Sequence, residues 1–354
     1  MCKFTILGPT SDSSVVTRAV FYEVVEGRVP GATYHKLSAL FGRLSVLSTA
    51  LTSWRFRRII LKFPALHALF RRSYAASLHR PQRVRLSGIG GAPAEGEDRY
   101  FIFCPGTNIA RISTRALADL RRKCPRAHLI FYLIDGVDRL ATVNDLRTED
   151  VLAYLDHFDA VYTYDRGDAE RYAERMQFIE IPVWRSPQTP AAPETDLYFC
   201  GRNKGREKLL IAIHKRLSDA GQRFKLHIVN ANSAVSTHPD IMHTSWIPYG
   251  ETVANVQRTN CILEILAAHN QESTLRYKEA VLYNKKLLTN NPNIAQLPYY
   301  DPRWMRTFQT ADDIDLDWLH TVEPIDYGYR GDYSAETFLK RVEELTRASK
   351  SQKT

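Results

Sequence analysis

Short apolar runs alternate with helix-like stretches along almost the whole chain of 354 residues. In the first half the apolar runs are Lys3–Leu7, Tyr100–Cys104, His128–Ile134, Ala160–Tyr164 and Phe178–Ile181. The stretches between them, such as Ser113–Lys123 and Asp168–Arg175, have the pattern of helices. This alternation is typical of βαβ units, whose strands are parallel and whose helices cover the sheet. The pattern therefore predicts an α/β fold.

A proline-rich stretch divides this pattern into two halves. The stretch is Ser186–Asp196, and its three prolines disfavour regular structure and stiffen the chain. The second half starts afresh with apolar or extended runs at Leu197–Cys200, Lys225–Val229, Trp246–Tyr249, Cys261–Ile265 and Lys286–Thr289, and with helices expected at Arg206–Ala220, near Glu251–Gln257 and from Thr274. Ser334–Ala348 has the spacing of a final helix, with Ser334 as its N-cap. We predict Rossmann-like domains at 1–185 and 197–330, a linker at 186–196, and a C-terminal helix and tail at 331–354.

Composition narrows the class of protein. Apolar residues make up 44% and charged residues 25% of the chain, as in globular proteins. No run of 18 or more apolar residues is available to span a membrane, and the N-terminus lacks the pattern of a secretory signal, so we expect a cytoplasmic protein. The five cysteines lack the CxxC or CxxH spacing of metal sites. The sequence therefore predicts neither a bound metal nor a disulfide framework.

Positive charge is concentrated in one segment. Residues 27–94 hold twelve Arg or Lys and no Asp or Glu, whereas the rest of the chain is slightly acidic. Leu37, Leu40, Phe41, Leu44, Leu47, Leu51 and Trp54 follow helical spacing, with Arg55, Arg57, Arg58, Lys62, Arg71 and Arg72 crowding the end and Pro64 breaking the pattern. The segment is expected to be helical and to bind an anionic membrane surface or a lipid-linked diphosphate acceptor. The alternatives are a core helix with a solvated basic face and a nucleic-acid interface, although no nucleic-acid module accompanies it.

The most informative local pattern is DLYFCGRNKGR, at Asp196–Arg206. A strand runs into Gly201, polar residues, Gly205 and then a helix, with Arg202, Lys204 and Arg206 alongside. Backbone donors at a helix N-terminus, together with basic side chains, suit a diphosphate. The spacing is neither a P-loop nor GxGxxG, which disfavours ATP hydrolysis and NAD chemistry. A solvated basic turn is the alternative.

A second polar pattern follows the run Cys261–Ile265 and reads NQESTLRYKEAVLYNKKLLTN at Asn270–Asn290. It predicts a loop with Gln271 and Ser273 and then a helix carrying Arg276 and Glu279. Such a helix begins at the carboxyl edge of the sheet, where ligands bind in open α/β folds. Glu279 would then accept hydrogen bonds from a ribose diol, while Arg276 and the amides of Ser273 and Thr274 face phosphates. The alternative is a solvated Glu279 paired with Arg276 at i,i+3.

These patterns, in this order, resemble the GT-B glycosyltransferases, in particular bacterial enzymes of capsule, exopolysaccharide and lipopolysaccharide assembly. The likeness rests on FDAVYTYDRGDAERY (Phe158–Tyr172), DLYFCGRNKGR (Asp196–Arg206), QESTLRYKEAVLYNKKLLTNN (Gln271–Asn291) and YYDP (Tyr299–Pro302), which together cover about residues 155–320. The basic segment 27–94 has no counterpart in the resemblance.

The resemblance implies two Rossmann-like domains facing a cleft, with the donor bound by the C-terminal domain and the acceptor by the N-terminal one. It implies that Glu279 occupies the ribose-binding position, and that Arg202 and Lys204 neutralise the pyrophosphate as the sugar leaves. Many retaining members have a glutamate eight positions earlier, where this chain has Gln271, with Glu272 beside it. GT-B enzymes stabilise the leaving group without a metal, so we expect no metal and no cofactor besides the donor substrate.

Two further roles are expected at loops. The nucleobase is predicted to contact Ser245–Gly250, where Trp246 or Tyr249 supplies an aromatic face; core packing of Trp246 is the alternative. An inverting mechanism needs a general base in the N-terminal half, and Asp135 and Asp165 are the candidates, with turn capping as their alternative role.

The sequence therefore predicts transfer of a sugar from a nucleoside-diphosphate sugar to a glycan or lipid-linked acceptor, on the cytoplasmic face of a membrane and without nucleic acid. Because Gln271 replaces the expected glutamate, a noncatalytic protein that binds sugar nucleotides or partners an active transferase is the chief alternative. A nucleic-acid-binding protein is the third.

Overall fold

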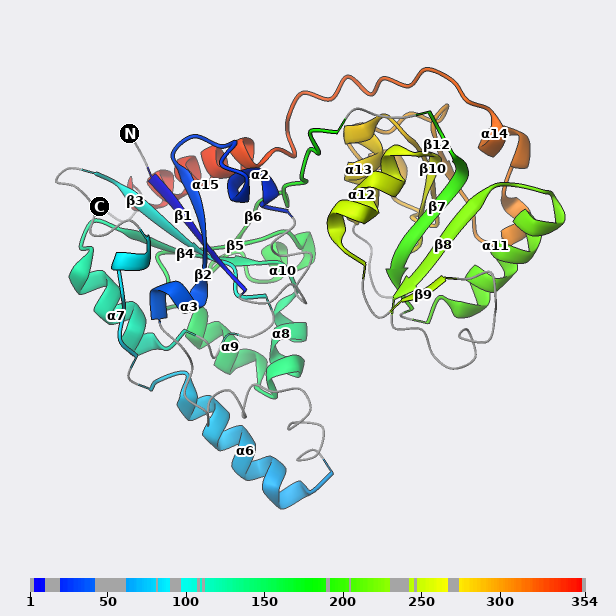
Figure 1. Ribbon diagram of the computed structural model, residues 1–354. Helices are drawn as coiled ribbons and strands as arrows, with labels where there is room; N and C mark the ends of the chain where they lie inside the picture. Colours follow the sequence, from blue (N-terminus) through cyan, green and yellow to red (C-terminus); the bar gives the residue numbers. More distant parts are fainter. Residues whose placement is uncertain are drawn as a thin grey trace. The chain divides into compact units, whose positions relative to one another are not determined.

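The computed structural model describes residues 3–9, 20–41, 62–80, 82–89, 97–106, 109, 112–188, 192–203, 205–229, 242–244, 247–266 and 274–351. The chain forms two compact units (Figure 1). Unit 1 comprises Met1–Trp184 and Tyr333–Thr354, and unit 2 comprises Arg185–Asp332. The C-terminal tail therefore belongs to the same unit as the N-terminal half.

Unit 1 is built on a sheet of six parallel strands in the order β2-β1-β3-β4-β5-β6. The strands are β1 (Lys3–Gly8), β2 (Ala32–Lys36), β3 (Arg99–Phe103), β4 (His128–Leu133), β5 (Ala160–Thr163) and β6 (Gln177–Phe178). The described helices are α2 (Tyr22–Val25), α3 (Leu37–Phe41), α6 (Pro64–Ser77), the 3-10 helix η1 (Ser87–Ile89), α7 (Thr114–Lys123), α8 (Val137–Asn144), α9 (Thr148–Leu155), α10 (Arg166–Arg171) and α15 (Ala335–Ser351). Chain order reverses between β1 and β3, which makes their junction the switch point of this sheet.

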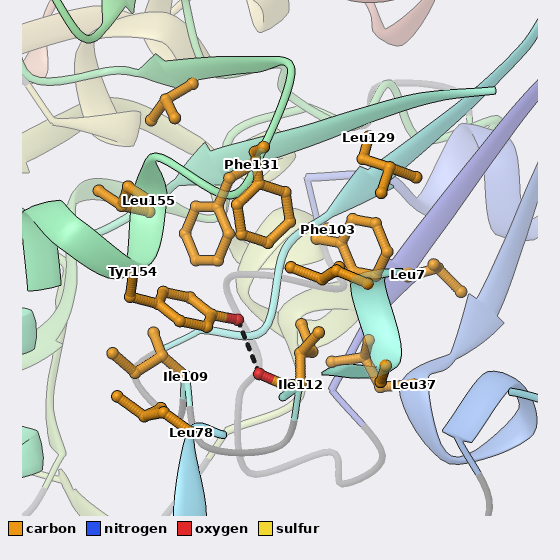
Figure 2. Close-up of a cluster of buried hydrophobic side chains, with 14 of the residues drawn as sticks. Leu7, Leu37, Leu78, Phe103, Ile109, Ile112, Leu129, Phe131, Tyr154 and Leu155 are labelled. Atoms are coloured by element: carbon orange, nitrogen blue, oxygen red, sulfur yellow. Dashed lines mark hydrogen bonds between the residues drawn. The ribbon is translucent and has the colours of Figure 1, made fainter. Parts of the chain in front are cut away.

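The core of unit 1 lies between the sheet and its helices. Phe103 and Phe131 from neighbouring strands meet residues of α6, α7 and α9, and the Tyr154 hydroxyl donates to the Ile112 carbonyl at 3.0 Å (Figure 2). Strands β3 and β4 are buried along their whole length, as expected of strands covered on both faces.

Helix α15 completes the other side of unit 1. Its Phe338 ring packs edge-on against Phe21 and Tyr132, with ring centroids 5.3 and 4.8 Å apart, and Thr346 Oγ1 lies 2.8 Å from the Tyr162 hydroxyl. Ser334 caps this helix by accepting from the Thr337 amide at 3.1 Å, which confirms the predicted N-cap.

Unit 2 contains a second parallel sheet, in the order β12-β11-β10-β7-β8-β9. Its strands are β7 (Thr195–Arg202), β8 (Phe224–Val229), β9 (Met242–Thr244), β10 (Thr259–Glu264), β11 (Lys286–Thr289) and β12 (Met305–Thr307). Its described helices are α11 (Glu207–Asp219), α12 (Tyr249–Gln257), α13 (Leu275–Tyr283), the 3-10 helices η3 (Ile294–Gln296) and η4 (Ala311–Asp313), and α14 (Leu316–His320). This is the strand order of the Rossmann fold, whose switch point lies between β7 and β10. The α/β class predicted from the sequence is confirmed.

One expectation about local structure is wrong. Tyr249 does not belong to an extended stretch but begins α12, because Pro248 at the N-cap has a φ of −56° and directs the chain into the helix. Pro64 does interrupt the helical spacing, since residues 62 and 63 are not helical and α6 begins at Pro64, where the first turn does not need the amide hydrogen that proline lacks.

The basic segment 27–94 is not helical throughout. It contains the strand β2 as well as α3, α6 and η1, and strand β2 pairs with β1 from Phe4–Ala32 to Gly8–Lys36. Residues 42–61, including Arg55, Arg57, Arg58 and most of the predicted apolar stripe, lie outside the described residues.

Candidate functional site

The switch point of unit 2 combines a strand, a tight turn and a helix. Strand β7 ends at Arg202, Gly205 has a φ of +79°, and α11 begins at Glu207. A left-handed φ favours glycine, so the second glycine of the sequence pattern is required by the turn. The first glycine is required by space: a Cβ on Gly201 would lie 2.9 Å from Phe199 Cζ and 3.2 Å from Arg206 Nη1.

Polar groups without partners are buried at this turn. Asn203 is 6% exposed, and neither its Oδ1 nor the Nε of Arg206 has a hydrogen-bond partner in the structure as far as it is described. Burial lowers the pKa of the Arg206 guanidinium, and the negative charge of Glu264 opposes this shift. Buried polar atoms in folded proteins are nearly always hydrogen-bonded, and an exception calls for an explanation such as an absent ligand.

Glu264 ends the neighbouring strand, β10, and is 1% exposed. One carboxylate oxygen accepts from the amide and hydroxyl of Thr274 at 2.8 and 2.7 Å, and the other accepts from the hydroxyl of Thr289 at 2.8 Å. Thr274 is the N-cap of α13, and its hydroxyl also accepts from the Arg276 amide at 3.1 Å. Glu264 therefore fixes the start of α13 against the carboxyl ends of β10 and β11.

Glu279, one turn into α13, is fully buried. Its carboxylate accepts a hydrogen bond from the Tyr249 hydroxyl of α12 at 2.8 Å and forms an ion pair with Arg276. Burial raises the pKa of the Glu279 carboxyl, while the charge of Arg276 and the Tyr249 hydroxyl act in the opposite direction. The expected i,i+3 pair between Arg276 and Glu279 is present, but Glu279 is buried, so the alternative of a solvated Glu279 is wrong. The expectation that Glu279 is open to a ribose diol is not met in this structure either, because its carboxylate has no exposed surface.

The structure describes some of the remaining residues predicted to bind the donor and does not describe the others. Arg202 is exposed at the end of β7, next to Gly201 and Asn203, while Tyr249 is 4% exposed and bonded to Glu279. Thr274 and Arg276 lie at the start of α13. Lys204, Trp246, Gln271 and Ser273 lie outside the described residues. The structure therefore places Gly201 and Arg202 at the end of β7 and Thr274, Arg276 and Glu279 at α13, which follows β10.

The predicted base candidates of unit 1 follow β4 and β5. Asp135 Oδ1 lies 3.0 Å from Arg139 Nε, and Asp165 caps α10 by accepting from the Asp168 amide at 3.0 Å. The turn-capping role is therefore observed for Asp165. Both positions lie away from the switch point between β1 and β3, since β4 and β5 are farther along the sheet.

Asp168, three residues after Asp165, is a further acidic group at this edge that the sequence did not single out. Its carboxylate accepts from the Val137 amide at 2.7 Å. Burial raises the pKa of Asp168, the Val137 bond opposes this, and the charges of Asp165 and Asp138 reinforce it. A carboxyl group with a raised pKa is better matched to proton transfer near neutral pH than an ordinary one.

The structure adds Asn203, Glu264 and Arg206 to the residues expected at the site of unit 2. Glu264 has a signal in the sequence, because it is an acidic residue inside the apolar run Cys261–Leu266. Arg206 was noted beside the glycines but not selected, since its burial depends on the packing of α11 against the sheet.

Within the described ranges, no group of three or more His, Cys, Asp or Glu side chains is arranged to hold a metal ion. No helix in the described part of the chain combines the length and the apolar character that a membrane span requires.

The chain is similar to the solved structures of several enzymes. An alpha-glucosyltransferase in complex with UDP and a 13-mer DNA containing an HMU base is 8% identical, with 98% of this chain and 90% of that chain covered and a TM-score of 0.46. The UDP-GlcNAc 2-epimerase from Methanocaldococcus jannaschii is 8% identical, with coverages of 98% and 99% and a TM-score of 0.45. The spinosyn forosaminyltransferase SpnP is 11% identical, with coverages of 98% and 99% and a TM-score of 0.40.

These neighbours include GT-B glycosyltransferases, the class that the sequence resembles. No protein-family model matches the chain, and no curated protein matches its sequence. Because the identities and TM-scores are this low, the activity of the chain has to be argued from its own residues.

Proposed function

We propose that the protein is a glycosyltransferase that moves a sugar from a nucleoside-diphosphate sugar to a glycan or lipid-linked acceptor in cell-surface polysaccharide assembly. The donor binds at the carboxyl edge of the sheet of unit 2. The transfer uses neither a metal nor a cofactor.

The observation that carries this proposal concerns two buried polar atoms at the switch point, Arg206 Nε and Asn203 Oδ1, which have no hydrogen-bond partner among the described residues. An open α/β sheet binds its ligands at such a switch point, outside the carboxyl ends of the strands. A guanidinium donor suits a phosphate oxygen, and an amide oxygen accepts from a hydroxyl. The turn therefore has unused hydrogen-bonding capacity of the kind that a sugar nucleotide supplies.

Neighbouring residues are assigned by the same chemistry. Arg202, Lys204 and Arg206 offset the negative charge that develops on the diphosphate as the sugar leaves, which is the term that stabilises the transition state. The Thr274 amide, which was expected to face the phosphates, donates instead to Glu264, so that role is left to the amide of Ser273. Glu279 binds the ribose hydroxyls in exchange for part of its contact with Arg276. Gln271 contacts the sugar, and Trp246 or Tyr249 contacts the base.

The donor assignment is tested by calorimetry with UDP, GDP, CMP and dTDP and their sugars. For the nucleotide that binds, the double variant Arg202→Ala/Lys204→Ala should weaken affinity by roughly 2 to 4 kcal/mol, on the scale of charge-assisted hydrogen bonds. Arg206→Met should act in the same direction. Lys208→Ala is the matched control, because Lys208 is exposed one residue inside α11. Unchanged affinity in folded variants would exclude this turn as the phosphate site.

The acceptor and any general base belong to unit 1 in this proposal. In an inverting reaction, replacing the base among Asp135, Asp165 and Asp168 with Asn should lower kcat by about a hundredfold to ten-thousandfold and leave donor affinity unchanged. Asp156→Asn is the control, since Asp156 is solvated and paired with Arg175. If none of the three lowers kcat, the reaction does not use a base from this edge.

A noncatalytic protein that binds sugar nucleotides is the alternative, favoured by Gln271 in place of the expected glutamate. Donor hydrolysis or transfer, followed by release of nucleoside diphosphate, separates the two. Tight donor binding without turnover, over a panel of glycan and lipid-linked acceptors, would favour the binding protein.

A further inference from the structure

Helix α6 of unit 1 has an apolar face that is buried at one end and exposed at the other. Toward its C-terminal end, Phe70, Tyr74 and the C-cap Leu78 are at most 5% exposed and join the core of the unit. Toward its N-terminal end, Phe63 at the N-cap, Leu66 and Leu69 are 53%, 51% and 62% exposed. A helix that only packs on a core buries its apolar face along its length, so the described residues of unit 1 do not explain the exposed N-terminal end.

These exposures stand out within the described residues. Only two other large hydrophobic side chains of the described residues are exposed, Val143 at 36% and Val322 at 59%. Val143 belongs to α8, and its neighbour Asn144 accepts a hydrogen bond from Tyr74 of α6. Four of the five therefore lie on α6 or on the end of α8 that contacts it. Figure 1 shows this part of unit 1, with α6 in light blue beyond α8 and α9.

The charge around this patch is positive. Lys62, Arg71 and Arg72 are exposed on or beside α6, and no Asp or Glu occurs anywhere from residue 27 to 94. Two acidic groups of the described residues act on α6: Asp145, whose carboxylate lies 2.5 Å from His67 Nε2 and 3.6 Å from Arg71 Nη2, and Asp150, which interacts with the charge of Arg71. Among the described residues neither forms an ion pair with Lys62 or Arg72, so the surface keeps positive charge.

We propose that α6 is a docking helix for the surface of a phospholipid bilayer with anionic headgroups. Phe63, Leu66 and Leu69 enter the boundary between headgroups and acyl chains, while Lys62, Arg71 and Arg72 pair with the headgroups. A bilayer surface accepts both classes of side chain at once, whereas a nucleic-acid backbone satisfies only the basic ones. At 14 residues the helix is about 21 Å long, which suits a helix lying in the plane of the interface.

This assignment deepens the proposed function, because it places the enzyme where a lipid-linked acceptor resides, but it does not rest on the donor site. Its evidence comes from unit 1 alone. Donor calorimetry and vesicle binding are separate measurements, so either proposal can fail while the other stands.

The test is co-sedimentation of the full chain with vesicles of phosphatidylcholine alone and of phosphatidylcholine with phosphatidylglycerol. The wild type should bind the anionic vesicles, bind neutral ones much more weakly, and lose affinity as salt is added. Leu66→Ser/Leu69→Ser should weaken binding by about tenfold or more at low salt, because two apolar side chains no longer enter the interface. Val322→Ser, at an equally exposed valine of unit 2, should leave binding unchanged.

The charges are tested separately. Lys62→Gln/Arg72→Gln should weaken binding by about tenfold or more at low salt, whereas Lys208→Gln/Arg330→Gln, which makes the same change in net charge on unit 2, should have little effect. Hydrogen exchange should show protection by anionic vesicles at α6 and the end of α8. All these residues are exposed, so the variants are expected to fold, and thermal unfolding verifies that.

Three outcomes would overturn the proposal. The first is failure of the wild type to bind anionic vesicles at low salt. The second is equal binding by Leu66→Ser/Leu69→Ser and Val322→Ser. The third is salt-sensitive affinity for duplex DNA or RNA that exceeds the affinity for vesicles and is unaffected by the two serines, which would assign the basic segment to nucleic acid.

Discussion

The carboxyl edges of the two sheets carry charge in different ways, although both sheets are parallel and six-stranded. In unit 2, Glu264 and Glu279 are buried and bonded to groups from α12, α13 and β11. In unit 1, Asp135 and Asp165 are partly exposed, and they pair with an arginine or cap a helix. Burying ionisable groups costs free energy, and such groups are concentrated at functional sites. The two buried carboxylates therefore favour a functional role for the carboxyl edge of unit 2.

The difference also concerns position. The charged groups of unit 2 flank β7 and β10, which border the switch point of their sheet, whereas Asp135 and Asp165 follow β4 and β5, beyond the switch point of theirs. The comparison therefore sets buried carboxylates that join several elements in unit 2 against partly exposed carboxylates that pair locally in unit 1. Four measurements can break or sharpen it.

The largest effect is expected from the buried ion pair of unit 2. Glu279→Ala leaves Arg276 charged and without its carboxylate, and should lower the free energy of unfolding by about 3 to 5 kcal/mol in chemical denaturation. Arg341 and Glu344 have the same order and spacing on the exposed face of α15, so Glu344→Ala should cost about 0.5 kcal/mol or less. Replacing both members with apolar residues, as in Glu279→Leu/Arg276→Met, should recover most of the loss. Equal costs at Glu279 and Glu344 would remove the distinction between the two sites.

The ribose role of Glu279 gives the next largest effect. Glu279→Gln should weaken donor binding by about 1.5 to 3 kcal/mol, since the amide keeps the shape but loses one acceptor and the charge. The loss should be much smaller for a 2′,3′-dideoxy donor, which lacks the hydroxyls concerned. Because both donors are measured by calorimetry on the same variant, any change in folding cancels. Equal losses would make Glu279 a structural partner of Arg276 alone.

A buried lysine in unit 2 predicts a pH dependence. Lys285 donates to the Gln257 carbonyl at 2.7 Å, and burial lowers the pKa of its ammonium to about 8. The folded state therefore binds fewer protons than the unfolded state between about pH 8 and the ordinary lysine value near 10.4, so stability should rise with pH through this window. The rise is expected to be about 1 to 2 kcal/mol after allowance for solvent screening.

The variant Lys285→Met isolates this contribution. Its free energy of unfolding, measured relative to the wild type, should fall as pH rises from about 8 to 10, because the variant lacks the titrating group. Lys208→Met, at an exposed position on α11, should track the wild type at every pH. A difference between Lys285→Met and the wild type that is constant with pH would show that the ammonium is solvated.

The smallest effects are expected in unit 1. Asp165→Ala removes the N-cap of α10 and should cost about 1 kcal/mol, while Asp135→Ala removes a solvated ion pair and should cost less. Thermal unfolding measures both. A cost of 3 kcal/mol or more at either position, as large as that of a buried pair, would mean that the two edges are alike.

The sequence was a good guide to the fold, because hydrophobic periodicity reports which backbone segments are buried. The runs at Lys3–Leu7, His128–Ile134 and Cys261–Ile265 correspond to β1, β4 and β10. Strand β2 was not predicted, since Ala32–Lys36 is half exposed and has no apolar run. Its place at the edge of the sheet follows from pairing with β1, which is a long-range contact.

For the candidate site, local patterns identified the turn after β7 and the helix with Glu279, because glycines and an N-cap have local causes. Tyr249 as a partner of Glu279 was not predictable, since the two residues are 30 positions apart and meet only through the packing of α12 beside α13. The same holds for Glu264, whose bonds to Thr274 and Thr289 join two strands and a helix.

By itself, the sequence determined the α/β class, the alternation of strands and helices, and the concentration of positive charge in residues 27–94. These depend on composition and on spacing along the chain. Only the tertiary structure decided which charges are buried and which apolar side chains of α6 are exposed, because burial depends on neighbours that are remote in sequence. Glu279 and Leu66 illustrate this: a charged residue is enclosed and an apolar one is exposed, and neither is marked by its sequence neighbours.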